Sequence, residues 1–317
     1  MTTGETIDSS GSVMTSETFR QMAVRDMVEW IARHGEPPDQ RENVDTASLR
    51  RRFPHLDAVQ VVEVAIDGPG GLLPGRTYRD PTADGLDRGL VWAHGGAFLG
   101  GRLDMPEANW VALELAARGI PVLSVDYRKC VGGVHYPAPS DDVLSWWDAA
   151  TRHAPQWLGV DAAHLVLGGA SAGATLTASA VQRLIERESR VPGGLLLVYP
   201  PLHPDSMDPS APISADTVHG LSLNYAGSTD ALSDPRVFPG LGDGLGFPST
   251  FLIACEHDAF LPSAEQFATT LRAAGVNAEV RIEAGAAHGH INEPSDETAL
   301  RTIDAIAAWM RAEAQRG

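Results

Sequence analysis

Apolar residues recur along the chain at two spacings, and each spacing predicts a different kind of element. Near the N-terminus, one stripe with helical spacing consists of Phe19, Met22, Ala23, Met27, Trp30 and Ile31. From residue 59 onward, short β-branched and apolar runs alternate with helical stretches. The predicted strands cover residues 59–66, 76–79, 90–93, 122–125, 165–167, 195–198, 251–254 and 280–282. The helices predicted between most of them cover residues 110–117, 143–150, 174–185, 264–273 and 300–310.

Strands that alternate with helices predict an α/β fold, with a mostly parallel central sheet and helices on both of its faces. In such a sheet the ligand site lies beyond the carboxyl ends of the strands, so the residues that directly follow each strand are the candidates for chemistry. Residues 200–248 interrupt the alternation, because they are rich in Pro, Asp, Ser and Gly. An irregular insertion of this length is typical of a lid or binding loop, and we expect it to lie over the site.

The composition narrows the classes of function. The chain has 317 residues and a formal net charge of −17, with 43% hydrophobic and 21% charged residues. These fractions are typical of a globular protein, and the acidic balance disfavours nucleic acid and anionic membrane surfaces as partners. The two cysteines, Cys130 and Cys255, exclude a disulfide framework and favour a reducing compartment. The first dozen residues are polar and lack the apolar core of a signal peptide, and no run is long enough for a transmembrane helix. We therefore expect a cytoplasmic protein with a disordered N-terminal tail.

The strongest candidate for chemistry is the run Gly169-Ala170-Ser171-Ala172-Gly173, between the predicted strand 165–167 and a predicted helix. This placement is that of a nucleophile elbow, in which glycines allow a sharp turn that presents a serine hydroxyl above the sheet. A glycine-rich turn that merely opens a helix is the alternative. The position between strand and helix favours the elbow, with Ser171 as the nucleophile.

A second candidate is the run His94-Gly95-Gly96-Ala97-Phe98, directly after the predicted strand 90–93. Backbone N–H groups in a glycine-rich loop can stabilise the oxyanion that forms during acyl transfer. Gly95 and Gly96 would supply two donors, and Ala172 a third. An ordinary tight turn is the alternative.

Acids and histidines follow the last two predicted strands. The run 256–258 is Glu-His-Asp and the run 288–290 is His-Gly-His. The order Ser171, Asp258, His288 is the order of an α/β-hydrolase triad along its chain.

Other residues of these two runs remain competitors for the same roles. His290 is the alternative base, and Glu256 or His257 could be supporting groups. A metal site formed by His288, His290 and Asp258 is disfavoured, because the pattern places no third histidine beside them. We expect neither a metal nor a cofactor.

With these motifs in place, the chain resembles the hormone-sensitive-lipase-like esterases, the bacterial family IV carboxylesterases, from about residue 55 to the C-terminus. The run that starts at His94, with Gly100-Gly101, is similar to that family's HGGGF block. The segments 126–128, 136–139 and 141–142 are similar to its DYR, YPA and DD elements, and the elbow run to its GDSAG motif. The run 258–261 is similar to its DPL acid motif, and 288–290 to its HGF.

The resemblance implies roles for individual residues. Ser171 would be the nucleophile, His288 the base and Asp258 the acid that orients the base. The implied oxyanion donors are Gly95, Gly96 and Ala172. His94 would be an orienting residue and not a base.

The chain also departs from the family pattern at several positions. Ala97 replaces the third glycine of the loop and would narrow it beside the alcohol side of the site. Ala170 replaces an aspartate, Lys129-Cys130 replaces Leu-Ala, and His290 replaces a phenylalanine. None of these changes removes a group of the implied triad, so the substrate is less closely implied than the mechanism.

The resemblance further implies an α/β-hydrolase fold with a helical cap. The catalytic domain would cover residues 56–317, and residues 1–55 and about 202–236 would form the cap. The apolar stripe near the N-terminus would then face the acyl pocket or the other cap segment. Plain packing of the stripe against the core is the alternative.

The expected function is that of a serine carboxylesterase, which hydrolyses short- to medium-chain esters of small molecules through an acyl-enzyme. Amidase or formamidase activity, acyl transfer and hydroxynitrile lyase activity are alternatives on the same triad. A non-catalytic ligand-binding homologue is a further alternative, against which the presence of His288 counts. The oligomeric state stays open, although homodimers formed through an edge strand are common in that family.

Overall fold

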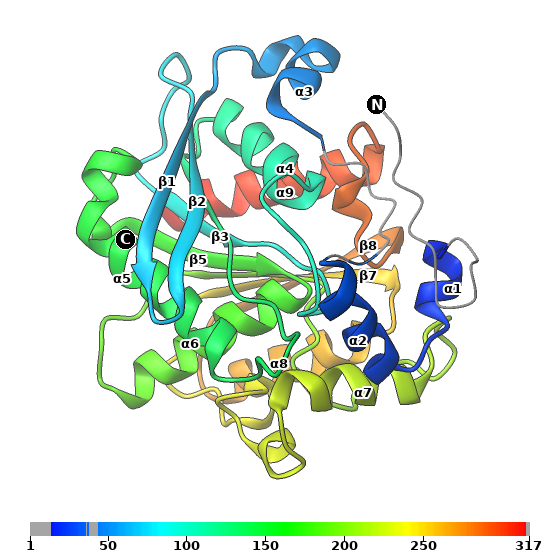
Figure 1. Cartoon of the computed structure of the whole chain (residues 1–317). Helices are drawn as coiled ribbons and strands as arrows, with labels where there is room; N and C mark the ends of the chain where they lie inside the picture. Colours follow the sequence, from blue (N-terminus) through cyan, green and yellow to red (C-terminus); the bar gives the residue numbers. More distant parts are fainter. Residues whose placement is uncertain (1–13, 36, 38–43, 315–317) are drawn as a thin grey trace.

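One central sheet organises the fold (Figure 1). In this computed structural model, which describes residues 14–35, 37 and 44–314, the sheet has eight strands in the order β1-β2-β4-β3-β5-β6-β7-β8. They are β1 (Gln60–Gly68), β2 (Gly71–Arg79), β3 (Gly89–Ala93), β4 (Val122–Val125), β5 (Leu165–Ala170), β6 (Leu195–Val198), β7 (Thr250–His257) and β8 (Ala278–Ala287). All neighbours from β4 to β8 are parallel, whereas β2 is antiparallel to both β1 and β4. The mostly parallel sheet predicted from the sequence is confirmed.

The strands follow the apolar runs of the sequence, and several extend a few residues beyond the predicted limits. Every residue of β3, β4, β5 and β6 is buried. Central parallel strands are covered on both faces, which explains why these segments are continuously apolar and do not alternate. The edge strand β1 has a mostly exposed and half-buried pattern.

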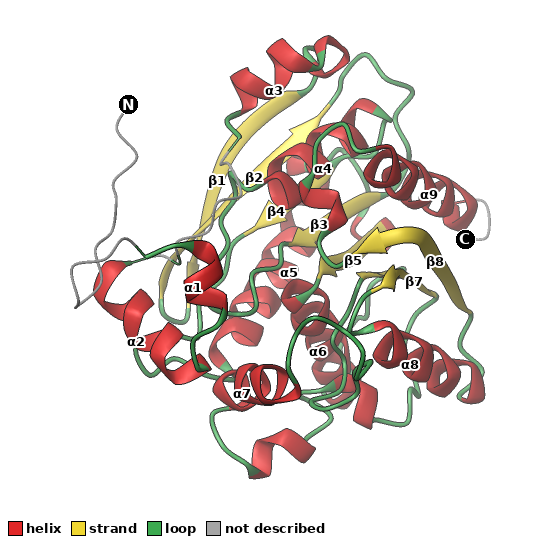
Figure 2. Cartoon of the chain, turned by 90° about the vertical axis from the view of Figure 1, so that its right-hand side faces the viewer, coloured by secondary structure: helices red, strands yellow, loops and turns green. Residues whose placement is uncertain are grey.

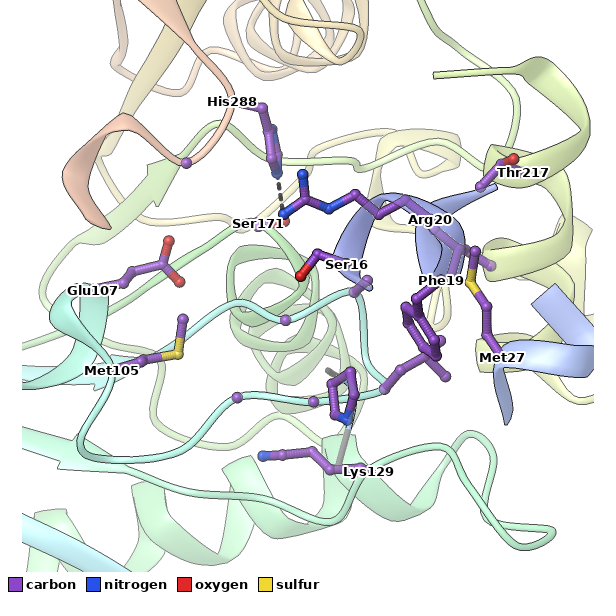
Figure 3. A pocket seen from close by; sticks show the side chains of 18 of the residues that line it. Ser16, Phe19, Arg20, Met27, Met105, Glu107, Lys129, Ser171, Thr217 and His288 are labelled. Atoms are coloured by element: carbon purple, nitrogen blue, oxygen red, sulfur yellow. Dashed lines mark hydrogen bonds between the residues drawn. The ribbon is translucent and has the colours of Figure 1, made fainter. Parts of the chain in front are cut away.

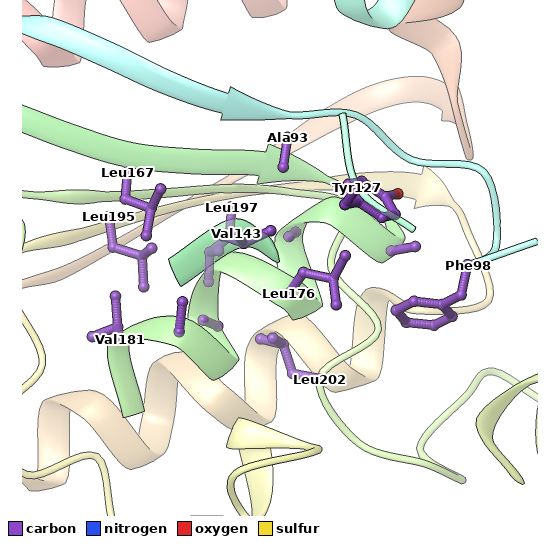
Figure 4. Close-up of a cluster of buried hydrophobic side chains, with 14 of the residues drawn as sticks. Ala93, Phe98, Tyr127, Val143, Leu167, Leu176, Val181, Leu195, Leu197 and Leu202 are labelled. Atoms are coloured by element: carbon purple, nitrogen blue, oxygen red, sulfur yellow. The ribbon is translucent and has the colours of Figure 1, made fainter. Parts of the chain in front are cut away.

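Helices cover both faces of the sheet, as the alternation predicted (Figure 2). One face carries α3 (Thr46–Arg52), α4 (Pro106–Ala117) and α9 (Glu297–Ala314), and the other carries α5 (Ala138–Trp157), α6 (Ala172–Glu186) and α8 (Leu261–Ala273). Figure 4 shows the second of these interfaces, where Leu167 and Leu197 of the sheet pack against Val143 of α5 and Leu176 of α6. Burial of apolar area on both faces is the main source of stability for this arrangement.

The N-terminal stripe forms two helices, although its spacing predicted a single one. They are α1 (Ser16–Arg20) and α2 (Val24–His34), with the break at residues 21–23. The second helix packs against α7 (Ala215–Ala226), which lies within the insertion, and a Cβ on Gly220 of α7 would come within 2.9 Å of Val24. The tail expected over the first dozen residues lies outside the described residues.

Helix α3 also differs from expectation, because no helix was predicted from the sequence of residues 46–52. Its residue Leu49 is fully buried in the cluster that contains α4 and α9. This segment belongs to the range 1–55 that was predicted as cap, yet it packs on the far face of the sheet from α1 and α2. The capping side chain of Asp45 accepts a hydrogen bond from Ser48 N–H, which starts this short helix.

Short 3₁₀ helices complete the described part of the chain. They are η1 (Pro54–Leu56), η2 (Ala162–His164), η3 (Asp230–Ser233), η4 (Pro239–Leu241) and η5 (His290–Asn292). Within the described residues, no helix is both long enough and apolar enough to cross a membrane.

Candidate active site

Ser171 lies on a sharp turn between β5 and α6. Its backbone has φ 51° and ψ −122°, a conformation that a residue with a side chain adopts only under strain. The turn requires glycine on both sides. A Cβ on Gly173 would lie 2.2 Å from Ala93 O, and a Cβ on Gly169 would lie 2.5 Å from the backbone of Gly173. The spacing of the two glycines therefore follows from the close approach of α6 to β3 and β5, as expected of an elbow.

The structure brings Ser171 together with two residues from the ends of β7 and β8. Ser171 Oγ lies 2.9 Å from His288 Nε2 (Figure 3). On the other side of the ring, His288 Nδ1 lies 2.8 Å from Asp258 Oδ2. Asp258 follows β7 and its side chain is 1% exposed, whereas the side chain of His288, which follows β8, is 33% exposed. A second oxygen of Asp258 accepts a hydrogen bond from Phe260 N–H at 3.1 Å. A hydroxyl, an imidazole and a buried carboxylate in this series can activate the hydroxyl as a nucleophile.

The competing residues of the same two runs lie elsewhere. His290 is buried, with Nδ1 3.3 Å from Cys255 Sγ and Nε2 2.7 Å from Thr302 Oγ1. Glu256 accepts a hydrogen bond from Gly285 N–H at 2.7 Å, and His257 is exposed. None of these contacts involves Ser171.

The loop after β3 lies beside Ser171, but its amides are oriented differently from the prediction. Gly95 N–H donates to Glu107 Oε1, so it is not free to bind an oxyanion as the sequence suggested. Gly96 and Ala97 line the pocket together with Ser171, and in the described part of the chain no acceptor is recorded for their N–H groups. The available pair of loop amides is thus shifted by one residue, to 96 and 97. Ala172 is the first residue of α6, so its N–H has no partner within the helix.

His94 contacts the loop after β3 and Asp126, and it does not reach Ser171. Its ring is buried, with Nδ1 2.6 Å from Gly95 O and Nε2 3.0 Å from Asp126 Oδ1. Lys129 Nζ lies 2.5 Å from the same carboxylate oxygen. Burial alone would raise the pKa of Asp126, but Lys129 and His94 outweigh burial and hold that pKa well below its ordinary value. His94 therefore anchors the loop to an ionised carboxylate.

An open pocket of about 750 Å³ lies in front of Ser171 and His288. Its floor is formed by Ser171, His288 and the loop after β3. Its apolar walls include Phe19 of α1, Met27 of α2 and Leu221 of α7. Helices that are distant in sequence thus enclose the space above the serine.

No group of three or more His, Cys, Asp or Glu side chains within the described residues is arranged to hold a metal ion. Asp141 and Asp142, which are adjacent in the sequence, each form an ion pair with an arginine. Arg183 lies 2.5 Å from Asp141, and Arg128 lies 2.8 Å from Asp142.

Glu107 is a polar residue at the site that the sequence analysis did not identify. It lies in the first turn of α4 and lines the pocket, although it is only 1% exposed. A signal was available, because α4 is otherwise almost entirely apolar and buried, and acids inside such a helix are rarely left without partners.

Comparison with known proteins agrees with this geometry. Residues 90–292 match the family described as alpha/beta hydrolase fold. The chain is 31% identical to an ethyl acetate hydrolase of Pseudomonas putida, over 75% of this chain and 79% of that protein. It is 32% identical to the esterase LipI of Mycobacterium tuberculosis, over 76% of this chain and 78% of that protein. The structure of a hyperthermophilic esterase from the archaeon Pyrobaculum calidifontis superposes with a TM-score of 0.70 at 26% identity, over 92% of this chain and 97% of the other. These similarities confirm the resemblance inferred from the motifs.

Proposed function

The chain belongs to the alpha/beta hydrolase fold family, and from this premise we propose that it is a serine carboxylesterase. It hydrolyses carboxylic esters of small molecules through an acyl-enzyme. The observation that carries this proposal is the hydrogen-bonded series Ser171, His288 and Asp258 at the base of an open, largely apolar pocket. Relatives with 31% and 32% identity are an ethyl acetate hydrolase and an esterase, which supports ester chemistry over the alternatives.

In the proposed mechanism Ser171 is the nucleophile. Its Oγ attacks the ester carbonyl carbon while His288 Nε2 takes the proton, and Asp258 orients the ring and stabilises the imidazolium. The proton then passes to the departing alcohol oxygen, which leaves an acyl group on Ser171. A water molecule, deprotonated by His288, attacks the acyl carbon and releases the acid.

The tetrahedral intermediates carry a negative oxygen that needs donors. We assign this role to the N–H groups of Gly96, Ala97 and Ala172, and not to that of Gly95. The assignment is supported by the bond from Gly95 N–H to Glu107 and by the place of Gly96 and Ala97 in the pocket wall. Donors of this kind each contribute about 10²- to 10³-fold to kcat in serine hydrolases.

We further propose that α1, α2 and α7 form the cap of a catalytic domain that covers residues 56–317. The apolar side chains of Phe19, Met27 and Leu221 in the pocket wall support this proposal. They would bury the acyl chain of a short- to medium-chain ester, so that the cap sets the chain-length preference.

A series of nitrophenyl esters from acetate to palmitate tests the function. We expect saturable hydrolysis with an optimum at short or medium chains, and inhibition by a serine-directed phosphonate. Hydrolysis of matched anilides at a higher kcat/KM would favour an amidase, and phosphonate labelling without turnover would favour a binding protein.

The cytoplasmic location and a homodimer remain proposals that rest on the sequence and the resemblance. Burial of both Cys130 and Cys255 as free thiols is compatible with a reducing compartment. Sedimentation velocity of the purified chain tests the dimer.

A further inference from the structure

Glu107 is a buried carboxylate beside the proposed oxyanion loop, and the proposed mechanism does not use it. It lies in the first turn of α4 and is 1% exposed. A buried carboxylate is costly unless hydrogen bonds replace its lost hydration. The question is therefore what holds it there.

Three donors converge on this carboxylate. Oε1 accepts a hydrogen bond from Gly95 N–H, while Oε2 accepts one from the Tyr199 hydroxyl and another from Asn292 Nδ2 at 3.0 Å. The backbone N–H of Glu107 donates in return to Asn292 Oδ1 at 3.2 Å. Among the described residues no lysine or arginine forms an ion pair with Glu107, so these neutral donors replace its hydration.

The three donors come from three different parts of the site. Gly95 belongs to the loop after β3. Tyr199 directly follows β6, and its ring centroid lies 4.8 Å from that of His288. Asn292 lies in η5, four residues after His288, and Asn292 Nδ2 also donates to Gly289 O at 3.2 Å. One carboxylate thus connects the oxyanion loop to the segment that carries the base.

The bond to Gly95 also fixes which amides face the substrate. Gly95 N–H points at Glu107, so the chain turns at the next residue, where Gly96 has φ 120°. A Cβ on Gly95 would lie 2.7 Å from Glu107 Oε1, so the contact requires glycine at this position. The N–H groups of Gly96 and Ala97 are thereby left for the pocket.

We propose that Glu107 is a positioning residue for the oxyanion loop: its carboxylate holds the Gly95 amide and so directs the amides of Gly96 and Ala97 at the reacting oxygen. This inference rests on the proposed esterase function and adds a residue to it. Glu107 does not touch the substrate oxygen itself, and it acts through the loop.

The chain contains a matched control on the same helix. Glu114 is also buried, and its oxygens contact His55, Trp110 and Arg118 and not the site. If Glu107 contributed only to stability, replacing either glutamate by glutamine would have the same kind of effect.

The test compares Glu107→Gln with Glu114→Gln. A glutamine at 107 has one acceptor oxygen and one NH2 group in place of two acceptors. The NH2 group faces Gly95 N–H in one orientation and the donors Tyr199 and Asn292 in the other, so in both the side chain is displaced and its hold on Gly95 N–H weakens. We expect kcat on a nitrophenyl ester to fall about 10- to 100-fold with KM within about threefold, by comparison with loss of an oxyanion donor. Glu114→Gln should leave kcat within about twofold even if its melting temperature falls.

A transition-state analogue supplies a readout that a structural role does not move. An alkyl trifluoromethyl ketone forms a hemiketal with the serine and places an oxyanion in the hole. Its Ki should rise in Glu107→Gln by about the same factor as kcat/KM falls, and should not change in Glu114→Gln. Unchanged kcat/KM and Ki in folded Glu107→Gln would overturn the inference.

If Glu107→Gln does not fold, Tyr199→Phe decides, because it removes one donor and keeps the ring. We expect a loss in kcat of severalfold with an equal rise in Ki, and an unchanged kcat would overturn the inference. Failure of the proposed function is recognised separately, because the unaltered chain would then hydrolyse no ester at all.

Discussion

Two histidines separated by one glycine have opposite surroundings in this protein. His288 is partly exposed and bridges Ser171 and Asp258. His290 is buried between Cys255 and Thr302, and burial lowers its pKa below 6.5. The first surroundings suit a group that exchanges protons with a substrate, and the second suit a neutral side chain that fills the core.

We predict that replacing the two histidines has very different consequences. His288→Ala should reduce kcat by about 10³-fold or more, because the triad acts as a unit. His290→Phe should reduce kcat by less than about tenfold, because it changes only packing and hydrogen bonds behind the site. Steady-state kinetics of both variants on one ester provides the measurement. Equal losses would mean that the base has been assigned to the wrong residue.

At this scale the sequence predicts the triad residues but not the oxyanion amides. Ser171, Asp258 and His288 each follow a recognisable strand, and their order along the chain distinguishes them from the competitors. The choice between Gly95 and Ala97 depends on which loop amide donates to a side chain of α4, the next helix along the chain. In the structure the Gly95 amide donates to Glu107, and nothing in the spacing of the loop residues indicates this bond.

Among the elements, the loop after β3 is tightly constrained at Gly96. Gly96 has φ 120°, and a Cβ there would lie 2.2 Å from Gly100 O, within the same loop. Gly132 also has a positive φ, of 61°, but a Cβ there would meet nothing within 4 Å. A substitution at Gly132 therefore tests the effect of backbone strain alone, whereas one at Gly96 tests strain together with displacement of the loop.

We therefore predict that Gly96→Ala lowers kcat by at least about 10²-fold, because the loop amides move away from the reacting oxygen. Gly132→Ala should lose at most a little stability, of about 1 kcal/mol, with kcat unchanged. Kinetics and thermal unfolding of both variants provide the measurement. An active Gly96→Ala would show that this loop does not supply the donors.

The N-terminal helices α1 and α2 are the second informative element. The sequence predicted one helix there because its apolar spacing continues through residues 21–23 and no Pro or Gly marks the break. In the structure Val24 is buried and Ala23 exposed, so the second helix begins a new stripe that matches α7. The contact between α2 and α7 joins segments that are about 190 residues apart in the chain. The local spacing of apolar residues carries no information about such a contact.

We predict that deletion of residues 1–43 changes chain-length preference. It removes Phe19 and Met27 from the pocket wall, and each methylene that loses burial costs about 0.8 kcal/mol, or about fourfold in kcat/KM. Long-chain esters should therefore lose about tenfold or more, and acetate less than about fivefold. Phosphonate labelling of Ser171 should persist, because the elbow is formed by β5 and α6. An unchanged profile at unchanged stability would show that these helices do not form the acyl site.

For the whole molecule, burial of titratable groups links stability to pH. The pKa of His290 is lower in the folded chain than the ordinary value of 6.5, mainly because of burial. As pH falls through 6.5, the unfolded chain takes up a proton that the folded chain does not, so the free energy of unfolding decreases. The contribution of His290 to the free energy of unfolding is complete above about pH 6.5, and it is lost as pH falls toward the pKa of this histidine in the folded state.

We predict that His290→Phe weakens this dependence. Urea unfolding at pH 7.5 and at pH 5.5 should show a smaller decrease for the variant than for the unaltered chain. An equal decrease in both proteins would mean that His290 does not contribute to it.

The central claim is that Ser171 carries the acyl group during ester hydrolysis. It is tested most directly by labelling the purified protein with a fluorophosphonate and locating the adduct by peptide mass spectrometry, with nitrophenyl ester hydrolysis followed in parallel. We predict one adduct, on Ser171, that forms as activity disappears, and neither adduct nor activity in Ser171→Ala. An adduct on another serine, or full activity in Ser171→Ala, would contradict the account.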